Sequence, residues 1–331
     1  MNTNKTTRRK WLGDMAAAPL VLGMGPFSLA RAQSYPSRPI TIVVPFGAGN
    51  ASDALVRLVA KSLVTSLGQP VVIENRPGAG GVGGTRQVAS ASPDGYTLLY
   101  TGTGATISQS LFKPAPYDMM RDFAPISAVS NNDVLILVRG KSPLRSLDDF
   151  VRQAKEAGKG LMVGVSLLGT TQHLAAELFK LRTRTDFTLV PFRSAAALIN
   201  GLIAGDVQAA FEFVPPALAT VRSGQLRALA VSSAKRSDAL PQVPTATELG
   251  IPDFNVSSWG MFVAPAGTPD AVVQLLNRHL VRAITDPEVA KRLRETGTRP
   301  TGSTVAQARE LVASEVLRWA DVIATAKIAL Q

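Results

Sequence analysis

The sequence predicts an α/β protein of two domains, each a mostly parallel sheet flanked by helices. Strand and helix patterns alternate from Gln33 almost to the end of the chain, which is typical of parallel α/β units. Two early strands run directly into loops of small residues that open helices. A chain of 331 residues with 46% hydrophobic residues is longer than a single core usually serves, and it suits two domains.

Each of the first three expected strands ends in a loop of small residues. The strands and their loops are 40–45 with 46–50, 71–74 with 75–84, and 96–101 with 102–105. The first loop opens a helix that ends at Gly68. Backbone N–H groups at such a strand end point at whatever lies beyond it, so a small anion can bind there without many charged side chains.

A second series of strands and helices follows. We expect strands at 134–139, 161–166, 188–192, 207–213, 226–233 and 256–264. The last expected helix has apolar residues at three-to-four spacing between Leu311 and Ile323. No linker composition separates the domains, so we expect the chain to cross between them through strands near 132–138 and 254–260. The first domain then comprises residues 33–131 and 256–331, and the second comprises residues 132–255.

Residues 1–32 predict a cleaved export signal that is not part of the fold. The paired arginines Arg8 and Arg9 precede a moderately apolar stretch, and Ala30-Arg31-Ala32 fits an A-x-A cleavage pattern just before Gln33. The pair favours the twin-arginine route, with the general secretory route as the alternative. Either route places the protein in a bacterial periplasm, and the rest of the sequence has no stretch long enough to span a membrane.

The charge pattern indicates small anions as partners. The formal net charge is +11, and it falls to +7 without residues 1–32, which contain five basic side chains and one acidic side chain. Lysine and arginine are scattered and form no block, which argues against nucleic acid. A modest positive field instead favours anionic small molecules.

Several catalytic and cofactor motifs are incomplete. Gly78-x-Gly80-x-x-Gly83 matches the dinucleotide fingerprint, but Pro77 occupies the tight turn and no acidic residue follows at ribose distance, so we expect a structural loop and no cofactor. There is no cysteine, and the two histidines show no metal-ligand spacing, so no metal site is expected. An exported α/β hydrolase using Ser166 with His173 remains an alternative, although its second elbow glycine is one residue late.

Polar residues converge at the ends of successive expected strands. In parallel α/β sheets these ends form the ligand crevice, and hydroxyl groups and helix N-termini around a crevice suit a carboxylate. Some of these serines and threonines would serve only as helix caps. Glu212 stands within an apolar run, where a carboxylate is costly unless it faces a partner. It would form a structural ion pair or face a ligand amine or hydroxyl.

The chain resembles the Bug family of extracytoplasmic solute receptors, the binding components of tripartite tricarboxylate transporters. The matching stretches are 40–49 with Asp53, 72–81, 92–99, 172–179, 190–193, 224–231, 243–245 and 248–250. The most specific is the run Glu74-Asn75-Arg76-Pro77-Gly78-Ala79-Gly80-Gly81. The resemblance covers essentially all of the sequence after residue 32.

The resemblance implies a two-domain periplasmic-binding-protein fold, type II-like, that closes on a small carboxylated solute. Its ligand is held by the loops after the first strand, before Gln172-His173 and at Phe192-Arg193. Combined with the strand ends, this gives the following ligand-binding residues: Phe46, Gly47, Ala48, Gly49, Asn50, Ser52, Thr101, Thr103, Ser166, Gly169, Thr170, Thr171, Phe192, Arg193, Ser194 and Glu212. Asn50, Ser194 and Glu212 depart from the usual glycine, glycine and aspartate.

The sequence therefore predicts a non-enzymatic periplasmic binding protein. It would be a monomer that captures an organic carboxylate, without a cofactor, and hands it to the membrane permease of a tripartite transporter. We expect Phe46 and Phe192 to form apolar walls of the site. A different output on the same fold, docking of the loaded protein on a sensor kinase, is the remaining alternative.

Overall fold

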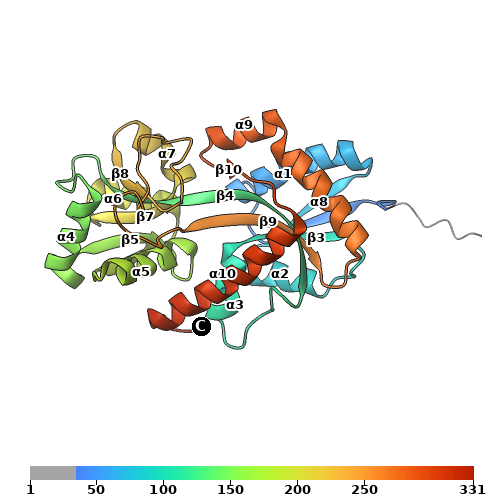
Figure 1. Cartoon of the computed structure of the whole chain (residues 1–331), viewed down its shortest axis with the longest axis horizontal. Coiled ribbons are helices and arrows are strands. Elements are labelled where there is room, and N and C mark those ends of the chain that lie inside the picture. Colours follow the sequence, from blue (N-terminus) through green and yellow to red (C-terminus); the bar gives the residue numbers. More distant parts are fainter. Residues whose placement is uncertain (1–34) are drawn as a thin grey trace, which may run out of the picture. The chain divides into compact units, whose positions relative to one another are not determined.

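A mixed sheet of ten strands runs through the computed structural model, which describes residues 35–331 (Figure 1). The strands are β1 (Ile40–Val44), β2 (Val71–Asn75), β3 (Thr97–Gly102), β4 (Phe123–Arg139), β5 (Met162–Ser166), β6 (Thr188–Phe192), β7 (Ala209–Phe213), β8 (Leu226–Val231), β9 (Ser257–Pro265) and β10 (Arg299–Pro300). The export signal predicted at residues 1–32 lies outside the described residues.

Helices separate most of these strands. They are α1 (Ala51–Leu67), α2 (Val82–Ala89), α3 (Thr103–Leu111), α4 (Leu147–Ala157), α5 (Thr171–Thr183), α6 (Ala195–Ala204), α7 (Val214–Arg222), α8 (Asp270–Thr285), α9 (Pro287–Glu295) and α10 (Val305–Thr325). Single 3-10 turns occur at Ala79–Gly81 and Gly158–Gly160. Within residues 35–331, no helix has the combination of length and apolar sequence that a bilayer crossing needs.

Two sets of parallel strands lie at the two ends of the strand order β2-β1-β3-β9-β4-β7-β5-β6. In the first half, β1 pairs in parallel with β2 and β3. In the second half, β5 pairs in parallel with β6 and β7. Each half has its own buried apolar clusters, with Val44 and Leu98 in the first and Val163 and Phe211 in the second.

The long strands β4 and β9 run side by side and antiparallel between these two sets (Figure 1). β4 pairs with β9 over its first part and with β7 and β8 over its second part. The sequence predicted only residues 134–139 as a strand, because the preceding polar residues 130–133 interrupt the apolar run. The strand continues through them because its neighbours satisfy its backbone groups on both sides.

The two expected crossings coincide with β4 and the start of β9. Residues Tyr35–Gln331 nevertheless form one compact unit. The boundaries between 33–131 with 256–331 and 132–255 therefore stay a prediction.

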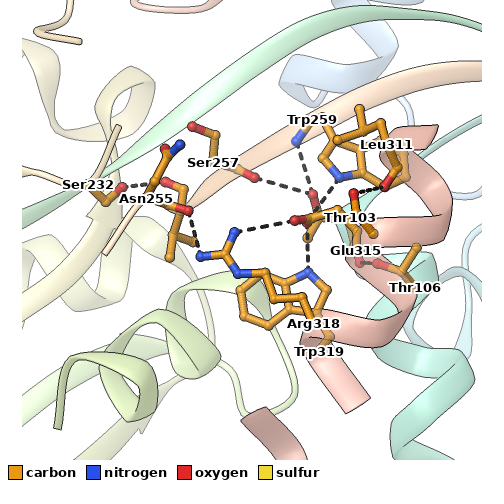
Figure 2. Close-up of polar contacts among 12 residues, drawn as sticks. Thr103, Thr106, Ser232, Asn255, Ser257, Trp259, Leu311, Glu315, Arg318 and Trp319 are labelled. Atoms are coloured by element: carbon orange, nitrogen blue, oxygen red, sulfur yellow. Dashed lines mark hydrogen bonds and ion pairs between the residues drawn. The ribbon is translucent and has the colours of Figure 1, made fainter. Parts of the chain in front are cut away.

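Helix α10 packs against both halves. Val305 joins the apolar cluster of the first half, whereas Trp319, Val322 and Ile323 join the cluster of the second half. Glu315, which is nearly buried, accepts hydrogen bonds from the indole nitrogens of Trp259 at 3.2 Å and Trp319 at 2.9 Å (Figure 2). A single carboxylate thus joins α10 to β9.

Arg318 extends this network to the segment that enters β9. Its Nη1 lies 3.3 Å from Glu315 Oε1, and its Nη2 donates to the Asn255 carbonyl at 2.6 Å (Figure 2). The helix and the crossing segment are consequently held together by charge-assisted hydrogen bonds.

Candidate ligand-binding site

Asp53 organises the loop after β1. Its Oδ2 accepts hydrogen bonds from the Gly49 amide at 2.8 Å and from Arg57 Nε at 2.9 Å, and its Oδ1 accepts one from Asn75 Nδ2 at 2.9 Å. Asn50 caps α1 by accepting from the Asp53 amide at 2.9 Å. The hydrogen bonds that the carboxylate accepts, with the largest effect from Arg57, lower the pKa of Asp53 to about 2 against the opposing effect of burial.

Part of this loop remains available to a ligand. Gly47, Ala48, Gly49 and Asn50 are exposed, and the amides of Gly47 and Ala48 donate no hydrogen bond within residues 35–331. The Gly49 amide, in contrast, is already used by Asp53. The sequence predicted the loop as a whole, and the structure leaves two of its amides free for an anion.

Ser52 and Phe46 face the protein more than the solvent. Phe46 is half-buried and packs against the core of the first half, and its carbonyl accepts from Asn75 Nδ2 at 3.2 Å. Burial raises the pKa of Tyr100, and hydrogen bonding to Ser130 and Ser52 opposes this effect. These contacts favour a supporting role for both residues.

The threonines at the end of β3 are buried in the polar network of the crossing. The Thr103 hydroxyl accepts from the Trp259 amide at 3.0 Å, and its carbonyl accepts from Thr106 at 2.8 Å (Figure 2). Gly102 permits this approach, since a Cβ there would lie 2.4 Å from the Trp259 carbonyl oxygen. Thr101 is also buried, at 2% exposure. This geometry favours a structural role for Thr101 and Thr103.

The second half brings several predicted residues together where β5, β6 and β7 end. Ser166 pairs with Phe192, and Val165 pairs with Phe211, so Glu212 lies beside Ser166. Glu212 is fully buried; its Oε1 accepts from Gln172 Nε2 at 2.8 Å and from the Phe213 amide at 2.7 Å, and its Oε2 accepts from Ser166 Oγ. Burial raises the pKa of Glu212, and these three hydrogen bonds oppose the rise.

The loop between β5 and α5 has a strained, exposed tip. Leu167 adopts a φ of 57° and is 52% exposed, and Leu168 is 53% exposed. A left-handed conformation costs a non-glycine residue about 1–2 kcal/mol, so it persists only where the surroundings hold it. Here the Leu167 amide donates to the Phe192 carbonyl at 3.0 Å.

His173 holds the second part of this loop through a hydrogen bond with Gly169. Its Nδ1 accepts from the amide of Gly169, a residue whose φ is 75°, at 3.1 Å. Burial, with a smaller effect of Lys180, lowers the pKa of His173 to about 4. Thr170 caps α5, and Thr171 begins the helix and is buried.

The hydrolase alternative finds no support in this geometry. The Ser166 hydroxyl donates to Glu212, and His173 Nδ1 is occupied by the Gly169 amide. Within residues 35–331 no hydrogen bond joins Ser166 to His173, as a nucleophile and its base would require.

The end of β6 is followed by Arg193, the one arginine or lysine of the predicted set. Arg193 is exposed, and its guanidinium has no hydrogen bond or ion pair within the described part of the chain. Ser194 caps α6 by accepting from the Ala197 amide at 3.2 Å. Phe192 is half-buried and packs against the core of the second half, close to Gly201.

The predicted residues thus form two groups, one at β1 and one at the ends of β5, β6 and β7. No hydrogen bond within residues 35–331 joins the loop 46–52 to the loops 166–171 and 192–194. Three supporting residues were absent from the predicted set: Asp53, Asn75 and Gln172. Asp53 had a local signal, its position three residues after Asn50, and Asn75 lies in the run that carries the family resemblance most specifically.

A cavity of the second half lies away from the predicted ligand-binding residues, and residues 35–331 contain no cluster of metal-binding side chains. A cavity of about 260 Å³ lies near the starts of β5 and β7, at the strand ends opposite to the predicted site, and is lined by Arg139, Leu144, Gln153, Gly205 and Gln208, among others. None of the predicted ligand-binding residues lines it. The described residues contain no group of three or more histidine, aspartate or glutamate side chains able to hold a metal ion.

Comparisons with known proteins identify what this chain is similar to. The family described as "Tripartite tricarboxylate transporter family receptor" matches residues 55–328. The protein BugT of Bordetella pertussis is 39% identical over 294 residues, which are 88% of this chain and 90% of that protein. Two solved structures from Rhodopseudomonas palustris are similar as well.

The first of these structures is Rpa4515 with adipate, at 34% identity and a TM-score of 0.78, covering 90% of this chain and all of that one. The second is MatC with bound malate, at 32% identity and a TM-score of 0.74, covering 87% of this chain and all of that one.

Proposed function

The chain belongs to the tripartite tricarboxylate transporter receptor family, and from that membership we propose that it captures a small organic carboxylate and delivers it to the permease of a tripartite transporter. Receptors of this family are periplasmic solute-binding proteins, not enzymes. The resemblance and the two-domain-like α/β fold expected from the sequence are thereby confirmed.

The observation that best supports carboxylate binding is the set of unused donors at the strand ends. Arg193 has a free guanidinium beside the start of α6, and the amides of Gly47 and Ala48 are free after β1. Arginine and helix N-termini both favour anions, and charge-assisted hydrogen bonds are the stronger ones. The structures of two relatives contain the carboxylates adipate and malate.

In this proposal the ligand lies between a first domain of residues 33–131 and 256–331 and a second domain of residues 132–255. The loop 46–50 binds it from one side, and the loops 166–171 and 192–194 bind it from the other. β4 and β9 bend as the domains close. A monomeric receptor, exported after cleavage near Ala32, would then present the closed form to the permease subunits.

Isothermal titration of the protein against a panel of mono- and dicarboxylates tests the proposal. We expect saturable binding of at least one acid, weakened about 10- to 100-fold by Arg193→Gln because a charge-assisted hydrogen bond is lost. Arg145→Gln is the matched control, since Arg145 is an exposed arginine of the second half outside the proposed loops. Folded protein that binds no carboxylate would overturn the proposal.

A further inference from the structure

Glu212 is a buried carboxylate that receives only hydrogen-bond donors. Gln172 Nε2 and the Phe213 amide donate to Oε1 at 2.8 and 2.7 Å, and Ser166 Oγ donates to Oε2. No cation contributes to its environment, which consists of burial and these three hydrogen bonds. The carboxylate therefore fixes the direction of each hydrogen bond around it.

This arrangement determines what the Ser166 hydroxyl can offer a ligand. A serine has one proton to donate, and here that proton is used by Glu212. No donor within residues 35–331 points at Ser166 Oγ, so its remaining capacity is that of an acceptor. Ser166 is 7% exposed; it ends β5 beside Phe192 at the end of β6, and the exposed Leu167 and Leu168 follow it directly.

Glu212 also fixes the orientation of the Gln172 side-chain amide. Because its Nε2 donates to Glu212, its Oε1 must point elsewhere, and Oε1 accepts no hydrogen bond within the described residues. Within residues 35–331, two side-chain atoms are both buried from solvent and without a hydrogen-bond partner: Arg299 Nε and Thr301 Oγ1. Gln172 Oε1 is not among them, so this acceptor of a residue that is only 7% exposed reaches the solvent.

Donors lie next to these two acceptors. Gln172 is the second residue of α5, and the amides of Thr171 and Gln172 belong to the first helical turn, where N–H groups have no intrahelical partner. A carboxylate suits those amides, whereas a hydroxyl or ammonium group suits Ser166 Oγ and Gln172 Oε1. A ligand that has a carboxylate together with a hydroxyl or ammonium group would therefore pair with both the amides and the two acceptors.

We propose that Glu212 makes this site selective for carboxylates that also carry a hydroxyl or ammonium group, by holding Ser166 and Gln172 as hydrogen-bond acceptors. This inference rests on the proposed function and narrows its substrate class. Glu212 is a positioning residue, since it acts through Ser166 and Gln172. A site whose Ser166 and Gln172 oxygens can only accept hydrogen bonds discriminates against acids without a hydroxyl or ammonium group, because those oxygens would then stay unpaired.

Titration calorimetry with matched acids tests this selectivity. The pairs are lactate with propionate, malate with succinate, and 2-hydroxyadipate with adipate, with aspartate as the ammonium counterpart of succinate. The measurements are made at about pH 8, because burial raises the pKa of Glu212 and a higher pH favours its ionised form. We expect the substituted member of the best-bound pair to bind at least about tenfold more tightly.

Two variants separate positioning from a structural role. In Glu212→Gln the new amide donates to Ser166 Oγ and frees the Ser166 proton, so the affinity ratio of each pair should fall at least about fivefold. Ser166→Ala removes the acceptor itself and should lower the ratio similarly, through weaker binding of the substituted acid, which loses its hydrogen-bond partner. Glu248→Gln is the matched control, because Glu248 pairs with Arg236 at the surface of the second half and should leave the ratio unchanged.

The outcomes distinguish the inference from the proposed function. Equal affinities within every pair for the wild-type protein, or ratios that neither variant changes, would overturn the selectivity and leave carboxylate capture intact. A folded wild-type protein that binds none of the acids would overturn the proposed function itself. If thermal melting shows that Glu212→Gln does not fold, Ser166→Ala decides the question alone.

Discussion

The carboxylate of Asp53 stabilises the loop after β1, and all of its hydrogen bonds within residues 35–331 are made to protein donors. It joins Gly49, Arg57 and Asn75 through hydrogen bonds, although it is 3% exposed. A carboxylate with three donors stabilises the loop after β1 and leaves its neighbouring amides free. Replacing it would remove three hydrogen bonds, of which that from Arg57 is charge-assisted.

We therefore expect Asp53→Ala to lower the free energy of unfolding by about 2 kcal/mol, measured by urea denaturation. Asp238→Ala is the control; Asp238 has a side chain that is 68% exposed and an ion pair of 3.8 Å with Arg294, and its loss should cost less than about 0.5 kcal/mol. Because the folded pKa of Asp53 is about 2, below its usual 3.8, its contribution is present above pH 3.8 and is lost as the pH falls toward 2. Equal losses in the two variants would contradict this assignment.

His173 predicts a different pH dependence. Its folded pKa of about 4 is lower than the usual 6.5, so the unfolded state takes up a proton first as the pH falls below 6.5. Stability should then decrease between pH 6.5 and 4, at up to about 1.4 kcal/mol per pH unit. His173→Asn keeps an acceptor for the Gly169 amide but cannot be protonated. Urea denaturation at pH 7 and 5 should show a smaller loss in the variant, by about 2 kcal/mol, and identical losses would disprove the role of His173.

The residue scale is where the sequence was least informative. It identified Glu212 as costly, and the structure gives that residue three donors from β5, α5 and its own strand. It did not identify Gln172, because a glutamine near a helix start has no periodicity or spacing that marks it. Partners that meet only through the fold leave no local pattern in the sequence.

At the scale of elements, α10 has a role that its apolar spacing alone did not reveal. The spacing predicted a helix, and the helix is present, but its two ends belong to the cores of different halves. Trp319 is fully buried in the second-half core, whereas Leu317 on the same helix is 74% exposed.

This contrast gives a matched pair of variants. Trp319→Ala should lower the free energy of unfolding by about 3–5 kcal/mol, since a large buried aromatic side chain leaves a cavity. Leu317→Ala should change it by less than about 0.5 kcal/mol. Chemical denaturation followed by far-UV circular dichroism measures both. A small effect of Trp319→Ala would mean that α10 is not needed to hold the second half.

The predicted strands were largely correct, and the main error was the length of β4. Apolar runs predict buried strands well, but residues 130–133 are Ser130, Asn131, Asn132 and Asp133. Their place in the strand depends on β9 and β10, which come from much later in the sequence.

At the scale of the whole molecule, ligand binding should stabilise the protein as a unit. A ligand that binds only the folded state, at one hundred times its dissociation constant, adds about 2.7 kcal/mol to the free energy of unfolding. We expect the melting temperature to rise by the same amount whether unfolding of the first or of the second half is monitored. Stabilisation of one half alone would show that the ligand does not bind between them.

The shared carboxylate of α10 and β9 also has an optical consequence. The chain has three tryptophans, and Trp11 lies in the predicted export signal, so the exported protein would emit from Trp259 and Trp319 alone. Both indoles donate to Glu315 next to the strand crossing (Figure 2). Their emission depends on that hydrogen bonding, and any movement of α10 against β9 alters it. The molecule therefore contains its own fluorescent reporter of any movement of α10 against β9, and no added label is needed.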